Sequence, residues 1–402
     1  MSEQIHFILV ITAALILFTS LYIKKLHRSF FSEPVLVMLI GLMLNLADLS
    51  IFKISDSHSL MNTFSRITII VALISTALRV KHKFIMKEKK NLSIMVLVAM
   101  AGMWIISSLI FLLVFRQDLL PSLLIGAIIT PTDPVVASSM VTGELAEKLL
   151  PEKVRSGLSF EAGSNDGLAF PMVMLPFLLM VFPAGHAMKE FLVRVLLWEN
   201  ITAIILAGIA GLLLGKVYHY FDKKKQMDEQ AIIGFSIAFT FFIYALFEII
   251  GTNSIISVFA AGVMFNSVLS QKENISEESV QEVFERMMVV PVFFLLGLVA
   301  PWKEWLETGP LLLLFAILVL LFRRLPVFLL MKPLLKGYQT KDLLLMGWFG
   351  PIGVAALFYA LHIQKMHLYE HLWIIVSFVV FSSTVVHGFT RYYFSKKYHQ
   401  AK

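Results

Sequence analysis

Apolar stretches recur along this chain from Ile5 almost to the C-terminal end, and short charged loops separate them. A helix needs about 20 predominantly apolar residues to cross the hydrocarbon core of a bilayer. Only 15% of the residues are charged, whereas about a quarter are charged in an ordinary soluble domain. The sequence therefore predicts an all-α polytopic membrane protein in which residues 1–402 form a single transmembrane domain with no soluble tail.

Apolar runs and Pro/Gly punctuation predict about 13 transmembrane helices. The expected spans are 5–23, 33–51, 62–80, 91–115, 118–141, 157–182, 190–215, 230–250, 252–270, 287–302, 309–331, 342–362 and 369–390.

The basic residues indicate how these spans are oriented. The chain has a net charge of +7, and most of its 34 lysines and arginines fall in the loops after odd-numbered spans. Cytoplasmic loops of membrane proteins carry the excess of basic residues, which places the N-terminus outside and the C-terminus in the cytoplasm. No basic face with interleaved aromatic residues is present, so we expect no nucleic-acid partner. Cysteine is absent, which excludes disulfides and thiolate metal sites.

Polar residues inside the spans are costly and mark functional sites by default. The sixth span contains Glu161, Asn165 and Asp166. Glu161 and Asn165 are four residues apart and share a helix face, whereas Asp166 lies about 140° around the helix from Glu161. We therefore expect one carboxylate to face a cavity and the other to face a neighbouring helix.

The fifth span is expected to be broken at mid-membrane. Pro131 and Pro134 flank Thr132 and Asp133, and proline removes backbone donors from a helix. In secondary transporters the carbonyls of such breaks hold cations. Asp133 either lies at an ion site or caps the second half-helix, and the two roles are compatible.

The eleventh span contains two adjacent arginines, Arg323 and Arg324. Arg323 is expected to neutralise Glu161. For Arg324 we favour an interfacial position, in which the side chain extends toward the headgroups from the end of a span.

Three glycines and a proline make the twelfth span a second candidate broken helix: Gly347, Gly350, Pro351 and Gly353. The alternative is that these small residues permit close helix packing. Other polar positions, among them Glu199, Glu248 and Asn253, lie near the ends of spans and are interpreted as structural.

Together these motifs resemble the monovalent cation:proton antiporter 1 family, of the NhaP and NHE sodium/proton exchanger type. The resemblance rests on Thr132-Asp133-Pro134, on Glu161-x-x-x-Asn165-Asp166-Gly167, on Arg323 and on the Gly347–Gly353 segment. It implies one exchanger domain over residues 1–402, with interleaved core and dimerisation subdomains in a homodimer. It also implies inverted six-helix repeats in which the broken fifth and twelfth spans cross. The absence of a long tail after Lys402 suggests a prokaryotic type in the cell (inner) membrane.

The resemblance also implies residue roles. Asp166 would bind Na⁺ or another monovalent cation alternately with a proton, with Asn165 as its neighbour. Thr132 would offer oxygens to the ion and Asp133 would cap half-helices, while Glu161 would pair with Arg323. One departure concerns Ser75, which stands where many family members have an acidic residue.

The function implied is sodium/proton antiport by alternating access. One titrating acid beside an asparagine predicts one proton per cation and hence electroneutral exchange. The alternative is potassium/proton or broad monovalent cation/proton antiport, and lower-ranked alternatives are a cation channel and a non-transporting sensor. We expect no enzyme activity, because no nucleophile and base pair or HExxH spacing is present. The only small partners expected are the transported ions Na⁺ and H⁺, with no cofactor.

Overall fold

The computed structural model describes residues 2–27, 32–47, 56–364 and 371–400, and every regular element in these ranges is a helix. The N-terminal part comprises α1 (Ser2–His27), α2 (Glu33–Leu46), α3 (Ser57–Arg79), α4 (His82–Ile94), the π-helix η2 (Met95–Ala99), α5 (Met100–Phe115), α6 (Leu119–Ile128), α7 (Pro134–Val141), α8 (Gly143–Leu149) and α9 (Glu152–Val181). The C-terminal part comprises α10 (Ala184–Glu190), the π-helix η3 (Phe191–Thr202), α11 (Ala203–Lys223), α12 (Glu229–Ile250), α13 (Ser254–Asn266), α14 (Gln271–Leu298), α15 (Trp302–Thr308), α16 (Pro310–Phe322), α17 (Leu325–Leu330), α18 (Thr340–Trp348), α19 (Val354–Gln364) and α20 (Leu372–Gln400).

Length and hydropathy identify the candidate membrane spans. Among the described residues, seven helical stretches are long and apolar enough to cross a membrane, or eight if the bent pair α14 and α15 counts as one span. Five shorter apolar helices accompany them, including α2, α6, α13 and α19. Each of the predicted stretches overlaps one or more of these helices, although residues 48–51 and 369–370 of two of them lie outside the described ranges. The all-helical, multi-span membrane architecture is thus confirmed.

Local sequence signals explain several helix ends. Asp228 caps α12 by accepting a hydrogen bond from the Ala231 backbone N–H at 2.8 Å. The same helix ends at Gly251, whose φ of +74° is readily adopted only by a residue without a side chain. Ser270 and Glu273 form a capping box at the start of α14, each side chain bonded to the other's backbone N–H.

Helix α14 begins well before the predicted start of the tenth span at residue 287. It packs closely along α2, because a Cβ on Gly41 would lie 2.1 Å from the Phe294 carbonyl oxygen. Likewise, a Cβ on Gly297 would lie 2.0 Å from the Met38 carbonyl oxygen. Small residues permit this backbone approach, as in other membrane helix pairs. The early start also places Glu285 inside a packed helix rather than in a loop.

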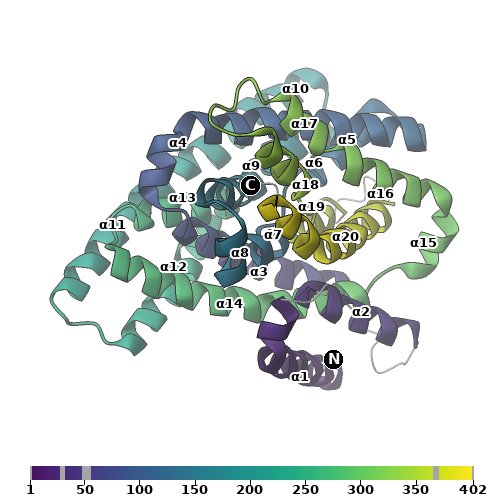
Figure 1. The fold of residues 1–402 in the computed structure, drawn as a ribbon. Helices are drawn as coiled ribbons and strands as arrows, with labels where there is room; N and C mark the ends of the chain where they lie inside the picture. Colours follow the sequence, from purple (N-terminus) through teal and green to yellow (C-terminus); the bar gives the residue numbers. More distant parts are fainter. Residues whose placement is uncertain (1, 28–31, 48–55, 365–370, 401–402) are drawn as a thin grey trace.

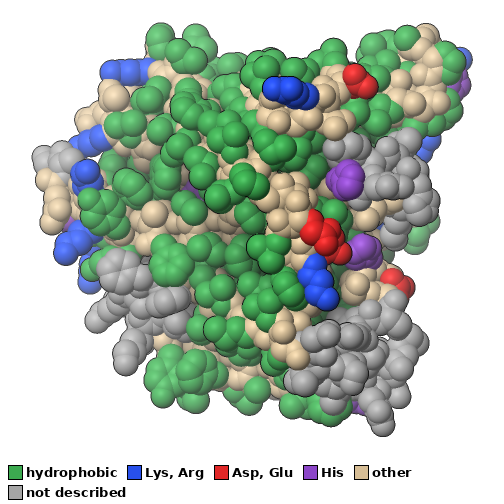
Figure 2. Space-filling model, turned by 90° about the vertical axis from the view of Figure 1, so that its right-hand side faces the viewer, with side chains coloured by type: hydrophobic (Ala, Val, Ile, Leu, Met, Phe, Trp, Pro, Cys, Tyr) green, Lys and Arg blue, Asp and Glu red, His purple; other side chains and the backbone are tan. Residues whose placement is uncertain are grey.

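Figure 1 shows α7, α18, α19 and α20 near the middle of the molecule, whereas α11 and α12 lie toward its periphery. Hydrophobic side chains predominate on the face drawn in Figure 2, with few charged groups among them. On the opposite side of the molecule, where α11 lies, Ile205, Ile209 and Leu213 are also at least half exposed. A surface of this kind suits contact with lipid tails.

Two helix interruptions meet inside the molecule. The first separates α6 from α7 at residues 129–133, and the second separates α18 from α19 at residues 349–353. The backbone N–H of Asp133 donates to the Pro351 carbonyl at 2.8 Å and joins the two breaks directly. Their contact brings the prolines and glycines of both segments into one buried region.

Candidate ion-binding site

The Asp133 side chain joins the two interruptions through hydrogen bonds to backbone amides. One carboxylate oxygen accepts the backbone N–H of Val135 at 2.8 Å, and the other accepts that of Val354 at 3.0 Å. These amides belong to the first turns of α7 and α19, whose N-termini both favour negative charge. Pro134 begins α7 and has no N–H to donate, so the cap reaches Val135 instead. One carboxylate therefore caps two half-helices.

Gly353 lies directly against this carboxylate. A Cβ added at Gly353 would stand 1.6 Å from Asp133 Oδ2, which no side chain can tolerate without movement. We expect Gly353→Ala to displace the Asp133 cap, to destabilise the protein by about 2–3 kcal/mol and to abolish transport. Thermal unfolding in detergent and an exchange assay measure the two effects.

The matched control is Gly185→Ala, because a Cβ at Gly185 would meet nothing within 4 Å. This variant should unfold and transport like the wild type. If Gly353→Ala matched Gly185→Ala in both assays, the close approach of Asp133 to the second interruption would be refuted.

Arg323 occupies the carbonyls that the interruptions leave without helical donors. Its guanidinium donates to the carbonyls of Ile129, Thr130 and Pro131, and also to that of Gly350 in the second break. The sequence suggested that such carbonyls would coordinate a cation. In this structure a buried arginine satisfies them, because its five N–H donors can reach several acceptors at once.

The buried ion pair of the site joins Glu161 to Arg324. The two guanidinium nitrogens Nη1 and Nη2 donate to the two carboxylate oxygens at 2.7 and 2.9 Å. Arg324 is only 2% exposed, so the prediction that it lies at an interface is wrong. The prediction that Arg323 pairs with Glu161 is also wrong, because Arg324 forms that ion pair. The chain bends between α16 and α17, at residues 323 and 324. Because of this bend, the two adjacent arginine side chains reach different partners.

Glycines make room for the Arg324 side chain. A Cβ on Gly350 would lie 2.1 Å from Arg324 Cδ, and one on Gly347 would lie 3.1 Å from Leu325 Cα. The Arg324 Nε also donates to the Met346 carbonyl at 2.9 Å. The glycine-rich segment thus serves both as a helix break and as a close packing surface, which are the two roles that its sequence suggested.

Asn165 and Thr132 complete a polar network around Glu161. The Asn165 amide nitrogen donates to Glu161 at 2.9 Å and to the Thr132 hydroxyl at 2.8 Å. The Asn165 amide oxygen accepts the Thr132 backbone N–H at 3.0 Å. The bond between Asn165 and Glu161 is the contact expected for residues four apart on one helix face. Asn165 is therefore fully engaged with the protein itself.

Asp166 differs from the other acids of this region. It is 1% exposed, and neither of its carboxylate oxygens has a hydrogen-bond partner within the described residues. A buried carboxylate without partners is costly unless it is protonated or binds a cation. By contrast, the carboxylates of Asp133 and Glu161 are occupied by backbone amides and by Arg324, respectively. Asp166 is the acid with free binding capacity among the three.

Asn253 and Tyr359 hold the backbone around Asp166. Asn253 was expected only to have a structural role, and no sequence pattern pointed to Tyr359. Pro171 lies inside α9 and cannot donate to the carbonyl of Gly167, four residues earlier. The Asn253 side chain donates to that carbonyl at 2.9 Å. The Tyr359 hydroxyl donates to the Asp166 carbonyl at 2.6 Å. The position of Pro171 signals that a donor is needed, but only the fold identifies Asn253.

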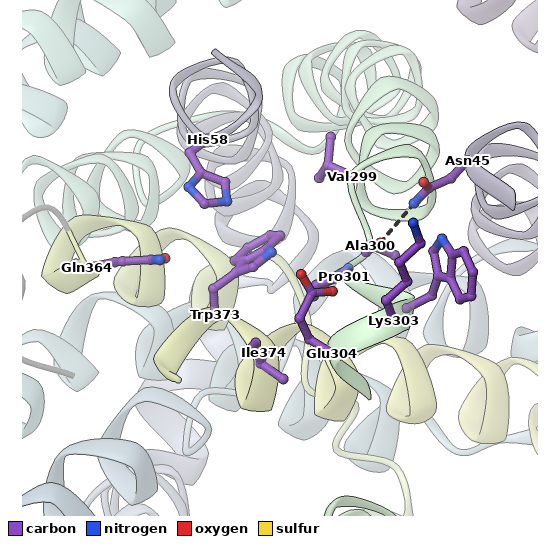
Figure 3. A pocket seen from close by; sticks show the side chains of 11 residues that line it. Asn45, His58, Val299, Ala300, Pro301, Lys303, Glu304, Gln364, Trp373 and Ile374 are labelled. Carbon is purple, nitrogen blue, oxygen red and sulfur yellow. Dashed lines mark hydrogen bonds between the residues drawn. The ribbon is translucent and has the colours of Figure 1, made fainter. Parts of the chain in front are cut away.

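A cavity of about 320 Å³ opens near the start of α9. Its lining includes Arg79 at the end of α3 and Ser159, which lies two helical turns before Asp166. A second cavity, of about 460 Å³, lies at the opposite end of α3 and contains His58 and Trp373 in its wall (Figure 3). None of the predicted site residues lines this second cavity.

Three features together define the class of ion-coupled secondary transporters. They are the membrane-spanning helices, the two interruptions that meet, and the unpartnered buried carboxylate beside them. Comparison with known proteins identifies the group within this class. Residues 11–394 match the family described as "Sodium/hydrogen exchanger, transmembrane", and the chain belongs to this family. It is thus a transporter rather than an enzyme, and the prediction of sodium/proton antiport is confirmed at the level of the family.

Curated relatives include fungal antiporters. The chain is 32% identical to a Na⁺/H⁺ antiporter of Schizosaccharomyces pombe, over 81% of this chain and 75% of the relative. It is 28% identical to Na⁺/H⁺ antiporter 2 of Zygosaccharomyces rouxii and 26% identical to a Na⁺/H⁺ antiporter of Saccharomyces cerevisiae. Each of these two alignments covers 92% of this chain, but only 50% and 41% of the relatives, respectively.

Among solved structures, the fold is similar to that of the sodium proton antiporter MjNhaP1 from Methanocaldococcus jannaschii. The TM-score is 0.68 at 17% sequence identity, over 99% of this chain and 97% of that chain. At this identity the likeness concerns the fold alone.

Proposed function

We propose that this chain exchanges sodium ions for protons and that Asp166 binds the two in turn. The observation that carries the proposal is the Asp166 carboxylate, which is buried and has no partner within the described residues. A carboxylate at this depth needs a positive partner, and either a proton or a monovalent cation meets that need. Because the two compete for one group, the release of one accompanies the binding of the other.

The stoichiometry follows from the neighbours of Asp166. Asn165 carries no charge, and its amide is bonded to Glu161 and Thr132. The Glu161 charge is balanced by Arg324. With one exchanging carboxylate, one proton is exchanged for one cation, and transport is electroneutral.

Thr132 and Asp133 are assigned to the same site in supporting positions. Thr132 lies in the first interruption. Its hydroxyl is bonded to Asn165, Arg324 and Glu161, so we assign its backbone carbonyl oxygen to the ion. Asp133 holds that interruption against the second one through its two caps. The charge that it places at the half-helix N-termini also favours a cation nearby.

Access to Asp166 would alternate as the helices that carry the site move against the rest of the molecule. In this structure a cavity reaches Ser159 from the side on which Arg79 lies. The segment after Arg79, from Lys81 into the first half of α4, is rich in lysine, which assigns that side to the cytoplasm and puts the N-terminus outside. On this assignment the cavity in the conformation described faces the cytoplasm.

The finer architecture is proposed as well. The eight candidate spans and the five shorter apolar helices would together make thirteen passes. Two inverted six-helix repeats, with the seventh pass between them, would place a broken helix fifth in each repeat. Three further features remain predictions. The resemblance implies a homodimer with interleaved core and dimerisation subdomains and residence in the cell membrane, and the distribution of basic residues implies a cytoplasmic C-terminus.

The test is exchange by the purified protein in proteoliposomes with an outward proton gradient. We expect sodium uptake to be coupled to proton release one for one, without generation of a membrane voltage. Clamping the voltage should therefore leave the rate unchanged. A rate that followed the clamped voltage would contradict electroneutral exchange by a single carboxylate.

The same preparation compares sodium, lithium and potassium. We expect sodium to be exchanged and potassium to be exchanged poorly. Comparable proton release with potassium would favour the broader monovalent cation/proton antiporter, and cation flux without proton release would favour a channel.

A further inference from the structure

A second buried carboxylate lies outside the site described above. Glu285 belongs to α14 and is only 4% exposed. One of its oxygens lies 3.5 Å from Arg79 Nη2 on α3, and the same nitrogen donates to the Ser75 hydroxyl at 3.2 Å, which places Ser75 beside the carboxylate. The other oxygen, Oε1, is buried and has no hydrogen-bond partner within the described residues. None of the caps, carbonyl contacts or ion pairs of the Asp166 site uses this group.

The charge of Glu285 is balanced only in part. The guanidinium of Arg79 is shared, because it lies 3.6 Å from Glu282 and 3.5 Å from Glu285. Both separations are longer than the 2.7–2.9 Å between Arg324 and Glu161. A cation at Oε1 would therefore complete a local charge balance that Arg79 leaves open.

The position of Glu285 connects the cavity with the exchanging carboxylate. Arg79, its charge partner, lines the cavity of about 320 Å³ together with Ser159. Thr76, next to Ser75, packs against α9, since a Cβ on Gly163 would lie 2.9 Å from the Thr76 methyl carbon. Gly163 is three residues before Asp166, on the same side of the helix. The α3 segment with Ser75 and Thr76 thus runs from the cavity toward Asp166.

We propose that Glu285, with the Ser75 hydroxyl, forms a second cation-binding station, at which a monovalent cation from the Arg79-side cavity is held before it reaches Asp166. The inference rests on the proposed function, because it assigns a role on the path to the same site. Carboxylate and hydroxyl oxygens are the ligands that hard cations prefer. Arg79 lies as close to Glu282 as to Glu285, so a small shift toward Glu282 releases the Glu285 carboxylate for the cation.

The test measures the sodium dependence of exchange from each side of the membrane in oriented vesicles. For Glu285→Gln we expect the KM for sodium added on the Arg79 side to rise about tenfold, because a charged ligand is lost. The KM on the opposite side should stay within about twofold and the maximal rate within about threefold of wild type. A merely structural role would alter both sides alike.

The matched control is Glu152→Gln, which makes the same chemical change at a residue that lines the cavity beside Arg79. Glu152 is exposed and pairs with Lys81 at 2.9 Å across the cavity rim. Such pairs are screened by solvent, so both KM values should match wild type. If Glu285→Gln does not accumulate in the membrane, Glu285→Asp replaces it. We then expect the KM on the Arg79 side alone to rise at least about threefold, since the carboxylate is withdrawn by one methylene.

Equal KM changes on both sides would overturn the inference, as would an unchanged KM on the Arg79 side in the variant measured. Asp166→Asn is run in parallel. If that variant still exchanged sodium for protons, the proposed function would fail whatever Glu285→Gln showed. If it were inactive while Glu285→Gln behaved like wild type, only the second station would be lost.

Discussion

Asp166→Asn is expected to lower sodium/proton exchange at least about 100-fold, to the level of empty vesicles. Asparagine has nearly the same size, but it neither ionises nor carries a charge to balance a cation. The buried site would then hold a neutral amide throughout the cycle. The measurement is the initial rate of sodium uptake driven by a proton gradient, in proteoliposomes that contain equal amounts of protein.

The matched control is Asp118→Asn, the same change at an exposed residue at the start of α6. It should exchange at the wild-type rate. Thermal unfolding shows whether loss of transport reflects loss of fold, and we expect Asp166→Asn to be at least as stable as wild type, because it removes a buried charge without a partner. Exchange near the wild-type rate in Asp166→Asn would refute the central assignment.

Arg324→Gln is expected to destabilise the protein by about 3–5 kcal/mol, because it leaves the buried Glu161 carboxylate without its charge partner. The double variant Glu161→Gln with Arg324→Gln should recover much of this loss, since no unpaired charge then remains. The free energy of unfolding, or the melting temperature in a fixed detergent, measures the recovery. Only the double variant separates the ion pair from the other contacts of Arg324.

Arg323→Gln provides the comparison within the same dipeptide. It should also destabilise the protein, because the carbonyls of Ile129, Thr130 and Gly350 lose their donor. Glu161→Gln should not restore it, since Arg323 and Glu161 do not form the ion pair. If Glu161→Gln rescued Arg323→Gln and failed to rescue Arg324→Gln, the pairing in this structure would be contradicted.

Much of the architecture could be predicted from local features of the chain. The apolar runs predicted helices in a membrane, because a backbone in lipid must satisfy its own hydrogen bonds. The prolines at 131 and 134 marked the first interruption, and the glycines at 347, 350 and 353 marked the second. The four-residue spacing of Glu161 and Asn165 predicted their shared face, and their side chains are hydrogen-bonded in the structure.

The partners of the charged groups could not be read from the chain. Arg323 and Arg324 have the same chemistry and adjacent positions, so only the bend between α16 and α17 decides which one reaches Glu161. Residue 285 falls between the predicted spans 252–270 and 287–302, because the polar residues at the start of α14 hide its helical continuation. Its place beside Ser75 depends on how two helices far apart in the sequence pack together.

The sequence by itself determined the helical membrane class, the positions of both helix breaks and the acids that lie inside the spans. Periodicity, proline chemistry and the cost of buried charge act within one segment and need no knowledge of its neighbours. The tertiary structure alone decided that Asp133 caps two helices, that Arg324 neutralises Glu161 and that Asp166 is left without a partner. These outcomes depend on which side chains from distant segments come within hydrogen-bonding distance, and only the packed fold determines that.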